Sequence, residues 1–551
     1  MPIGSISSAK QNLRPAWMQW FIPSIGDLIF TALLGLLAYT ALAVRLLGDA
    51  GIGWHIRTGQ FLLATHAVPH VDPFSSTMTG QPWFAWEWLY DGIVGWLDNL
   101  AGLNAVVFLA ALIIALTFSW AFRLLLRRGT NFLLAVILVL LAVSASMIHF
   151  FARPHVISWL LTLVWFSILE SSEIQSGGAP AVPPLRGLLL WILPPLMVAW
   201  VNIHGGFLLG FALLGIYWLS AVWRYFQRGD GCFERALQKI RAGKHAIRLS
   251  LIGLASVLAT LINPYGWKLH LHVYQYLSNR FLMDHIDEFQ SPNFHGVAQK
   301  CFAVLLMLTL VAFASKSRQK NETQVNEIQV KEALLVLFAV YSGLYASRNI
   351  PVSSLLLILV SGPRLSNALD TFSRRRLTSS SLTPSSQGFF QRMQSIECSL
   401  HGHIWPIAAV ALTCWITFHG GRLGTKQLIN AHFDAKRFPV AAANYLDQRK
   451  EHSVFAPDFW GGYLIYRLYP QTKLAIDDRH DFYGETFLKS YLKAVHVEPG
   501  WQDFLNQHEV RCIVVPKDSA LANILFETPA WQSIYSDDVA VVFTRPSDLL
   551  R

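Results

Sequence analysis

Long apolar runs recur along the chain up to residue 420. A hydrocarbon core about 30 Å thick needs roughly 20 residues of helix, and lipid admits only helices and closed barrels. We therefore expect about eleven transmembrane helices, at residues 25–47, 103–125, 130–150, 154–171, 186–201, 205–225, 246–262, 300–315, 331–348, 350–365 and 404–420. Charged residues make up only 14% of the chain, against about 25% in soluble proteins. The sequence predicts a mostly α-helical, polytopic membrane protein.

Residues 1–420 form the expected transmembrane domain, and two polar stretches interrupt its apolar pattern. Residues 48–102 separate the first two spans and are expected to form a long external loop. Within this loop, residues 86–98 mix Trp and Asp in an amphipathic pattern, which indicates a helix lying on the membrane surface. Residues 366–400 are rich in Ser, Arg and Gln, which is typical of a flexible linker, here on the cytoplasmic side.

After the last span, residues 421–551 change to alternating short helices and strands. Helices are expected at 438–448, 485–495, 500–508 and 519–527, and strands at 453–456, 473–477, 511–516 and 539–544. This alternation predicts a small α/β domain. Its two Gly-bearing loops, 460–464 and 477–484, are expected to face the membrane domain or a ligand.

The distribution of Lys and Arg predicts the orientation of the chain. With the N-terminus in the cytoplasm, most basic residues fall in cytoplasmic loops, as the positive-inside rule requires. The loop 48–102 and the α/β domain then lie outside the cytoplasm, on the outer face of a bacterial-type inner membrane. Polar clusters at 153–155, 202–206, 263–272, 287–296 and 348–351 fall on the same face. The net charge of +10 therefore indicates topology and contact with membrane lipids, and no nucleic acid is expected as a partner.

Asp49 and Glu87, both in the external loop, are the candidate catalytic residues. Asp49 directly follows the first span, where it could act as a general base or hold a divalent cation such as Mg²⁺ or Mn²⁺. It could equally be a solvated residue at a helix end. Glu87 stands between Trp86 and Trp88, an environment that raises a carboxyl pKa or demands a partner. The alternative is a first-turn Glu that complements a helix dipole.

Most of the candidate substrate-binding residues are cations or imidazoles on the outer face, where a lipid phosphate would offer them charge-assisted hydrogen bonds. The set comprises His55, Arg57, Arg153, His155, His204, Lys268, His270, Arg348, Asp478 and Arg479. Snorkelling to lipid headgroups, helix packing, or ion pairing within the loops would explain the same residues. Asp72 precedes a proline and is interpreted as a turn residue.

This layout resembles the GT-C superfamily of integral-membrane glycosyltransferases, which use polyprenyl-phosphate-linked sugars. The shared pattern is a first span, an external loop with an early acidic residue, a surface helix, many spans and an external α/β domain. In that family the early acidic residue is linked to catalysis, and Asp49 is the matching position. Residues 460–464 (WGGYL) are loosely similar to the Trp-Trp-Asp-Tyr-Gly motif of oligosaccharyltransferases, but Gly461 and Gly462 replace its characteristic residues. Recognition of an acceptor sequon is therefore not supported. The paired acids of protein mannosyltransferases are also missing, because Ala50 follows Asp49.

The resemblance implies a hexosyl- or pentosyltransferase that moves a sugar from a polyprenyl-phosphate donor to a glycan, lipid or protein acceptor. Asp49 would activate the acceptor and Glu87 would assist it, while Arg153 and Arg348 would hold the departing phosphate. Two alternatives stay open. A flippase of lipid-linked glycans would need polar residues at the bilayer midplane and repeated halves, and a non-catalytic assembly scaffold could use the same fold.

Overall fold

The apolar runs of the sequence form the helices of one bundle in the computed structural model, which describes residues 18–173, 188–227, 233–315, 325–377 and 393–545 except 394, 398 and 401. The bundle helices are α2 (Ile25–Tyr39), α3 (Leu42–Leu46), α6 (Leu103–Arg127), α7 (Phe132–Ser146), α8 (His155–Ser172), α10 (Leu193–Ile203), α11 (Leu208–Gln227), α12 (Phe233–Ala259), α15 (Val297–Ala314), α16 (Val325–Tyr345), α17 (Ile350–Leu377) and α19 (Ile404–Phe418). A short helix, α1 (Met18–Phe21), precedes them. Each expected span overlaps a helix of this set.

Among the described residues, length and apolar composition identify seven helices that can cross a membrane: α6, α7, α8, α11, α12, α15 and α17, several extended by a short 3-10 turn. Three further apolar helices, α2, α10 and α19, are shorter. The protein is thus a multi-pass, mostly helical membrane protein, as predicted. Of the expected linker 366–400, residues up to 377 continue α17, and residues 378–392 lie outside the described part of the chain.

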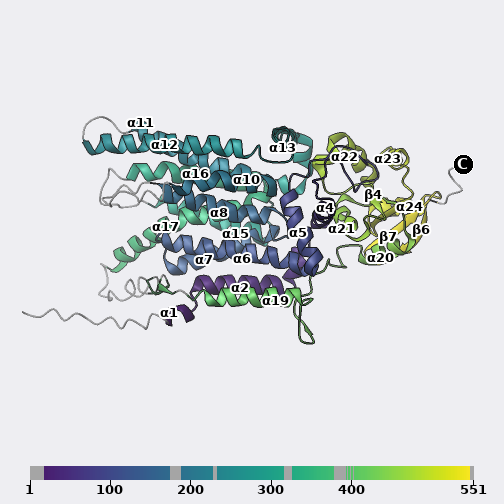
Figure 1. The fold of residues 1–551 in the computed structure, drawn as a ribbon, viewed down its shortest axis with the longest axis horizontal. Coiled ribbons are helices and arrows are strands. Elements are labelled where there is room, and N and C mark those ends of the chain that lie inside the picture. Colours follow the sequence, from purple (N-terminus) through teal and green to yellow (C-terminus); the bar gives the residue numbers. More distant parts are fainter. Residues whose placement is uncertain are drawn as a thin grey trace, which may run out of the picture.

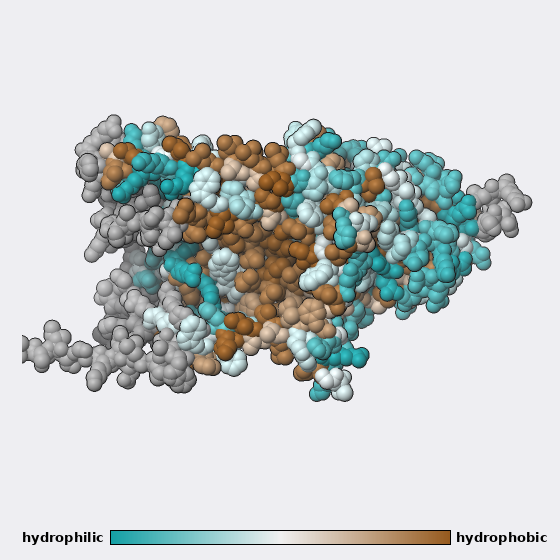
Figure 2. Space-filling model, in the orientation of Figure 1, coloured by the Kyte–Doolittle hydropathy of each residue, from teal (hydrophilic) through white to brown (hydrophobic). Residues whose placement is uncertain are grey.

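The outer surface of the bundle is apolar, as contact with lipid requires. On the face shown in Figure 2, a hydrophobic band crosses the middle of the bundle and a hydrophilic surface covers the C-terminal region. Large apolar side chains that are more than half exposed include Ile262, Leu310, Leu337, Tyr341 and Ile407. Helices α6 and α17 are the most completely buried of the seven, whereas α15 is the most exposed, so α6 and α17 lie at the centre of the bundle.

The stretch between the first two spans is more helical than expected. The expected surface helix is present as α5 (Trp88–Ala101), but a second helix, α4 (Ile52–Thr65), precedes it. The two helices touch through glycines, since a Cβ atom on Gly59 would lie 3.0 Å from the Cα of Gly95. Helices α13 (Lys268–Ser278) and α14 (Arg280–His285) lie at the same end of the bundle, followed by a 3-10 turn, η4 (Asp287–Phe289). Figure 1 shows α4, α5 and α13 between the bundle and the C-terminal region.

The C-terminal region has the expected α/β composition. Its helices are α20 (Val440–Arg449), α21 (Asp458–Leu468), α22 (His480–His496), α23 (Trp501–Gln507) and α24 (Ala520–Glu527). Its strands are β1 (Arg422–Leu423), β2 (Lys426–Gln427), β3 (Ser453–Val454), β4 (Lys473–Leu474), β5 (Cys512–Pro516), β6 (Gln532–Ser536) and β7 (Ala540–Thr544). Strands β5, β7 and β6 form an antiparallel sheet in that order, while β3 and β4 pair in parallel and β1 and β2 form a hairpin. The prediction of a loop at 460–464 is wrong, because these residues lie inside α21.

The stretch between the first two spans contributes to the sheet of the C-terminal region. Ser75 forms a parallel bridge with Leu474 in β4, and Phe455 forms another with Ile513 in β5. The backbone N–H of Ser76 donates to the carbonyl of Leu474 at 2.7 Å. The stretch between the first two spans and the C-terminal region are therefore joined by backbone hydrogen bonds, and the polar residues of both meet at one end of the bundle.

Candidate active site

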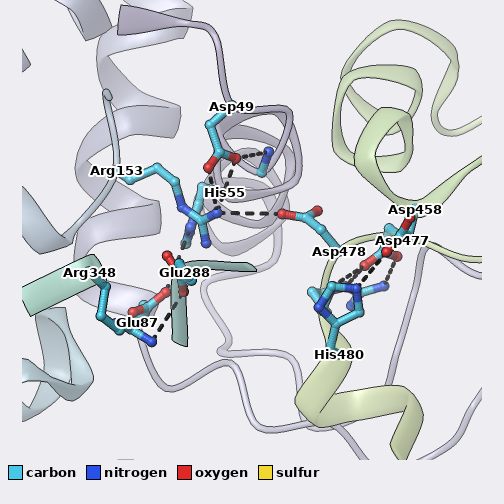
Figure 3. Close-up of polar contacts among 12 residues, drawn as sticks. Asp49, His55, Glu87, Arg153, Glu288, Arg348, Asp458, Asp477, Asp478 and His480 are labelled. Carbon is cyan, nitrogen blue, oxygen red and sulfur yellow. Dashed lines mark hydrogen bonds and ion pairs between the residues drawn. The ribbon is translucent and has the colours of Figure 1, made fainter. Parts of the chain in front are cut away.

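Asp49, Arg153 and Asp478 meet where the bundle, the segment 48–102 and the C-terminal region join (Figure 3). Asp49 lies in the turn between α3 and α4, and its Oδ1 accepts a hydrogen bond from the N–H of Gly51 at 2.8 Å. Nη1 of Arg153 lies 3.0 Å from both carboxylate oxygens of Asp49 and 3.5 Å from Oδ2 of Asp478. One guanidinium thus joins two carboxylates that lie far apart in the sequence.

The two carboxylates differ in exposure and in charge. The side chain of Asp49 is 27% exposed and that of Asp478 is 15% exposed. Burial, reinforced by the nearby charge of Asp49, raises the pKa of Asp478 to about 7. Burial alone would lower the pKa of Arg153, but the carboxylates of Asp49 and Asp478 outweigh it and raise that pKa above its ordinary value, so the guanidinium stays charged.

Glu87 lies in a buried row of ionisable groups beside these residues. His55, in α4, contacts Asp91 through Nδ1 at 2.6 Å and Glu87 through Nε2 at 3.7 Å. His204 lies 3.9 Å from the other oxygen of Glu87 and pairs with Ser158 at 2.8 Å. Burial raises the pKa of Glu87 to about 8 and lowers that of His55 well below its ordinary value. Glu87 is the residue before α5, and its side chain makes no capping hydrogen bond to that helix.

Two further predicted residues lie at the edge of this cluster. Arg348 pairs with Glu288 at 3.1 Å and covers the ring of Phe289. Burial opposes ionisation of Glu288, but Arg348 and Arg153 outweigh it and lower the pKa of Glu288. His155, at the start of α8, donates from Nε2 to the carbonyl of His149 at 2.8 Å in the tautomer this geometry requires.

Arg479 and Arg57, both expected to bind substrate, make structural contacts within the protein instead. Arg479 is only 2% exposed and pairs with Asp72 at 2.8 Å and Asp477 at 2.7 Å. It therefore connects the segment 48–102 to the C-terminal region through a buried ion pair on each side. Arg57 donates to the backbone carbonyl of Tyr466 in α21, which attaches α4 to the C-terminal region. Asp72 also accepts hydrogen bonds from the N–H groups of its own turn, in agreement with its interpretation as a turn residue.

Lys268 and His270 lie on α13, apart from the cluster around Asp49. The side chain of Lys268 is exposed, and His270 pairs with Thr260 at 2.8 Å. Among the described contacts, neither side chain touches Asp49, Arg153 or Glu87. A direct role for these two residues in the chemistry is not supported by this placement.

The donor groups around Asp49 do not fit a divalent cation. The described residues contain no group of three or more His, Cys, Asp or Glu side chains placed to hold a metal ion. Both oxygens of Asp49 face the guanidinium of Arg153, whereas Mg²⁺ and Mn²⁺ favour oxygen ligands. The prediction of a metal at Asp49 thus receives no support from its neighbours.

Two residues of the site were not predicted: Asp91 and Glu288. Asp91 follows Glu87 by four positions, so the two lie on one face of a helix, and this spacing was visible in the sequence. Glu288 lies within the polar cluster 287–296 without a motif to single it out. The sequence places Asp477 beside Asp478 in the expected loop 477–484, and its ion pair with Arg479 agrees with the alternative of ion pairing within that loop.

The comparisons with known proteins support the fold. No family model and no curated protein matches the sequence. The structure is similar to the apo crystal structure of the Archaeoglobus fulgidus oligosaccharyltransferase, with a TM-score of 0.53, 11% identity, and coverage of 95% of this chain and 74% of that one. The same enzyme tethered to an acceptor peptide containing the NVT sequon gives a TM-score of 0.53 at 12% identity, with coverage of 96% and 74%. ArnT from Cupriavidus metallidurans in the apo state gives 0.47 at 14% identity, with coverage of 95% and 97%. The chain has the GT-C fold.

Proposed function

We propose that this protein transfers a sugar from a polyprenyl-phosphate-linked donor to an acceptor hydroxyl at the membrane surface. The observation that carries the proposal is the pair of carboxylates, Asp49 and Asp478, held by Arg153 where the membrane bundle meets the C-terminal region. The GT-C fold supports this class of reaction, and the apolar bundle offers a lipid-linked donor a place to anchor.

The proposed reaction is a single inverting displacement. The acceptor oxygen attacks the anomeric carbon of the donor, and its proton passes to Asp49, the more exposed of the two carboxylates. The bond between the anomeric carbon and the phosphate oxygen breaks, and its electron pair leaves with the polyprenyl phosphate. Arg153 and Arg348 stabilise the charge on that phosphate. No acid is needed for the leaving group, in contrast to glycoside hydrolysis.

Glu87 assists this step in its protonated form. With its pKa raised to about 8, its carboxyl group is neutral at pH 7 and can donate a hydrogen bond. The imidazole of His55, which is itself paired with Asp91, lies 3.7 Å from this carboxyl group, and the imidazole of His204 lies 3.9 Å from it. We assign His155 and His204 to the wall of the donor site.

We further propose that the reaction takes place on the outer face of a bacterial inner membrane. The N-terminal helix α1 and the C-terminal region lie at opposite ends of the bundle (Figure 1), and the basic loops favour a cytoplasmic N-terminus. The acceptor is a glycan, lipid or protein that reaches the site from outside. Because Asp49 faces Arg153, no step of this mechanism requires Mg²⁺ or Mn²⁺.

The test is turnover by the full chain in detergent with a panel of polyprenyl-phosphate sugars. Release of polyprenyl phosphate and sugar-bearing product are both followed by mass spectrometry. We expect Asp49→Asn to lower turnover about 100-fold or more, whereas the matched exposed variant Asp447→Asn, on α20, behaves as wild type. Absence of turnover across the panel would contradict the proposed function, and wild-type turnover by Asp49→Asn would remove Asp49 from the mechanism.

A further inference from the structure

We infer that the guanidinium of Arg153 takes the place of a divalent metal ion at this site. It contacts the two carboxylates and also binds the phosphate of the donor. The inference rests on the proposed function and extends it: transfer is independent of divalent metal, and a residue of the chain supplies the positive charge. Three observations support it.

The first observation is the position of Nη1 of Arg153. It lies 3.0 Å from both oxygens of Asp49 and 3.5 Å from Oδ2 of Asp478, so it occupies the space between the carboxylates. A Mg²⁺ or Ca²⁺ ion needs six or more oxygen ligands at about 2.0–2.6 Å. To bind both carboxylates, such an ion would first have to displace the guanidinium, and it would leave that charge without its partners.

The second observation is that the remaining edge of the guanidinium is available. Among the described residues, the side-chain hydrogen bonds of Arg153 leave from Nη1 alone, and the side chain is 24% exposed. The Nε and Nη2 groups form a planar fork whose geometry matches two oxygens of a phosphate. The guanidinium of Arg153 can therefore bind the two carboxylates through Nη1 and the leaving phosphate through Nε and Nη2.

The third observation is that neighbouring residues leave space for the side chain of Arg153 and fix the position of its backbone. A Cβ atom on Gly51 would lie 2.5 Å from Oδ2 of Asp478 and 2.9 Å from Nη1 of Arg153, so a side chain at this position would displace the carboxylate or the guanidinium from the contact. The N–H of Ala152 donates to the carbonyl of Leu46 at 2.7 Å, and Tyr90 donates its hydroxyl to the carbonyl of Ala152 at 2.8 Å. These bonds fix the backbone beside Arg153 to the end of α3, close to Asp49.

The first experiment measures sugar transfer by the full chain after extensive chelation with EDTA, with and without added Mn²⁺. We expect turnover to change less than about twofold in either condition, a small effect beside the 10²–10³-fold lost when a stabilising donor is removed. Loss of turnover in EDTA that Mn²⁺ restores would overturn the inference while leaving the proposed function intact. A lack of turnover under all conditions would instead contradict the proposed function.

The second experiment does not depend on activity. Mn²⁺ is titrated into the purified wild-type chain and followed by electron paramagnetic resonance, with Asp49→Asn as the comparison. We expect no saturable Mn²⁺ binding that depends on Asp49. Saturable binding to the wild type that is lost in Asp49→Asn would overturn the inference.

The third experiment separates charge from geometry at Arg153. Arg153→Lys keeps a point charge but loses the fork, so we expect a raised KM for the donor and a loss in kcat/KM of about 10-fold, with a larger loss of about 100-fold or more in Arg153→Ala. The exposed Arg449→Ala is the control for removal of a surface arginine. Thermal unfolding of each variant checks the fold, and Arg153→Lys serves where Arg153→Ala does not fold. A folded Arg153→Ala or Arg153→Lys with wild-type kcat and KM would overturn the role.

Discussion

The carboxyl group of Glu87 lies between two imidazoles, 3.7 Å from His55 and 3.9 Å from His204. Burial raises its pKa from 4.5 to about 8. As pH rises from 4.5 to 8, the unfolded chain releases this proton while the folded chain keeps it. The stability that Glu87 contributes is therefore fully present below about pH 4.5 and is lost as pH rises toward 8.

The variant Glu87→Gln keeps the neutral shape but cannot release a proton. We expect the melting temperature of the wild type to fall, relative to that of Glu87→Gln, as pH rises through this window. Tryptophan fluorescence of the detergent-solubilised protein measures both unfolding curves, and the chain offers 20 tryptophans as reporters. Glu527→Gln, which replaces an exposed acid at the end of α24, is the control. Parallel pH dependence in wild type and Glu87→Gln would contradict the raised pKa.

Arg479 gives a second prediction for a single residue. Its removal in Arg479→Ala leaves Asp72 and Asp477 buried without their common cation. Breaking a buried ion pair in this way costs about 3–5 kcal/mol, so we expect a marked fall in thermal stability and faster proteolysis of the C-terminal region. Arg449→Ala, which breaks an exposed pair with Glu451, should change little. Equal stability of the two variants would show that Arg479 does not connect the segments.

At the scale of elements, the contact between α21 and α4 positions the turn that carries Asp49. A Cβ atom on Gly462 would lie 3.0 Å from the Cα of Gly51 and would also collide with the carbonyl of Ala50. Gly462→Ala therefore pushes α21 away from the turn that carries Asp49. We expect a loss of about 1–3 kcal/mol in stability, as for other overpacked sites, together with reduced sugar transfer. Gly35→Ala in α2, where nothing lies within 4 Å of the added atom, is the matched control. A Gly462→Ala variant indistinguishable from Gly35→Ala would argue against this packing role.

The sequence predicted most elements because an apolar run of membrane length has few structural solutions. It did not predict α4, whose helical periodicity is obscured by His55, Arg57 and two glycines among apolar residues. It also placed a loop at 460–464, because adjacent glycines usually favour turns. In the structure Gly461 and Gly462 are helical, and they allow α21 to approach its neighbours closely.

The candidate site could be predicted only in part, and for a physical reason. Residue type and sidedness indicated Asp49, Arg153 and Asp478, but each was interpreted separately. That one guanidinium joins both carboxylates depends on contacts between distant parts of the chain, which a single sequence does not contain. Arg479 is a further example of this limit. The sequence shows its charge, which favours a ligand, but it does not show that the side chain is buried between Asp72 and Asp477.

For the whole molecule, the orientation proposed above is open to a direct test. In a variant without the five native cysteines, a single cysteine is introduced at Asp503, exposed on α23, or at Gln227, exposed at the end of α11 that faces away from the C-terminal region. We expect a membrane-impermeant maleimide to label the cysteine at position 503 in intact cells with a permeabilised outer membrane. The cysteine at position 227 should react only after the inner membrane is broken. The reverse pattern would invert the topology.

The bridge between Ser75 and Leu474 joins two parts of the chain that are synthesised at different times. It can therefore form only late in the assembly of the protein. During synthesis the ribosome releases Asp49 and Arg153 early, whereas Leu474 and Asp478 emerge only after the last helix has been inserted. Closing so long a loop costs little more entropy than closing one half as long, so the delay is one of timing rather than of stability. The nascent chain thus contains Arg153 and Asp49 through most of its synthesis, and Asp478 is added last. Membrane insertion is complete before Asp478 can join Asp49 and Arg153.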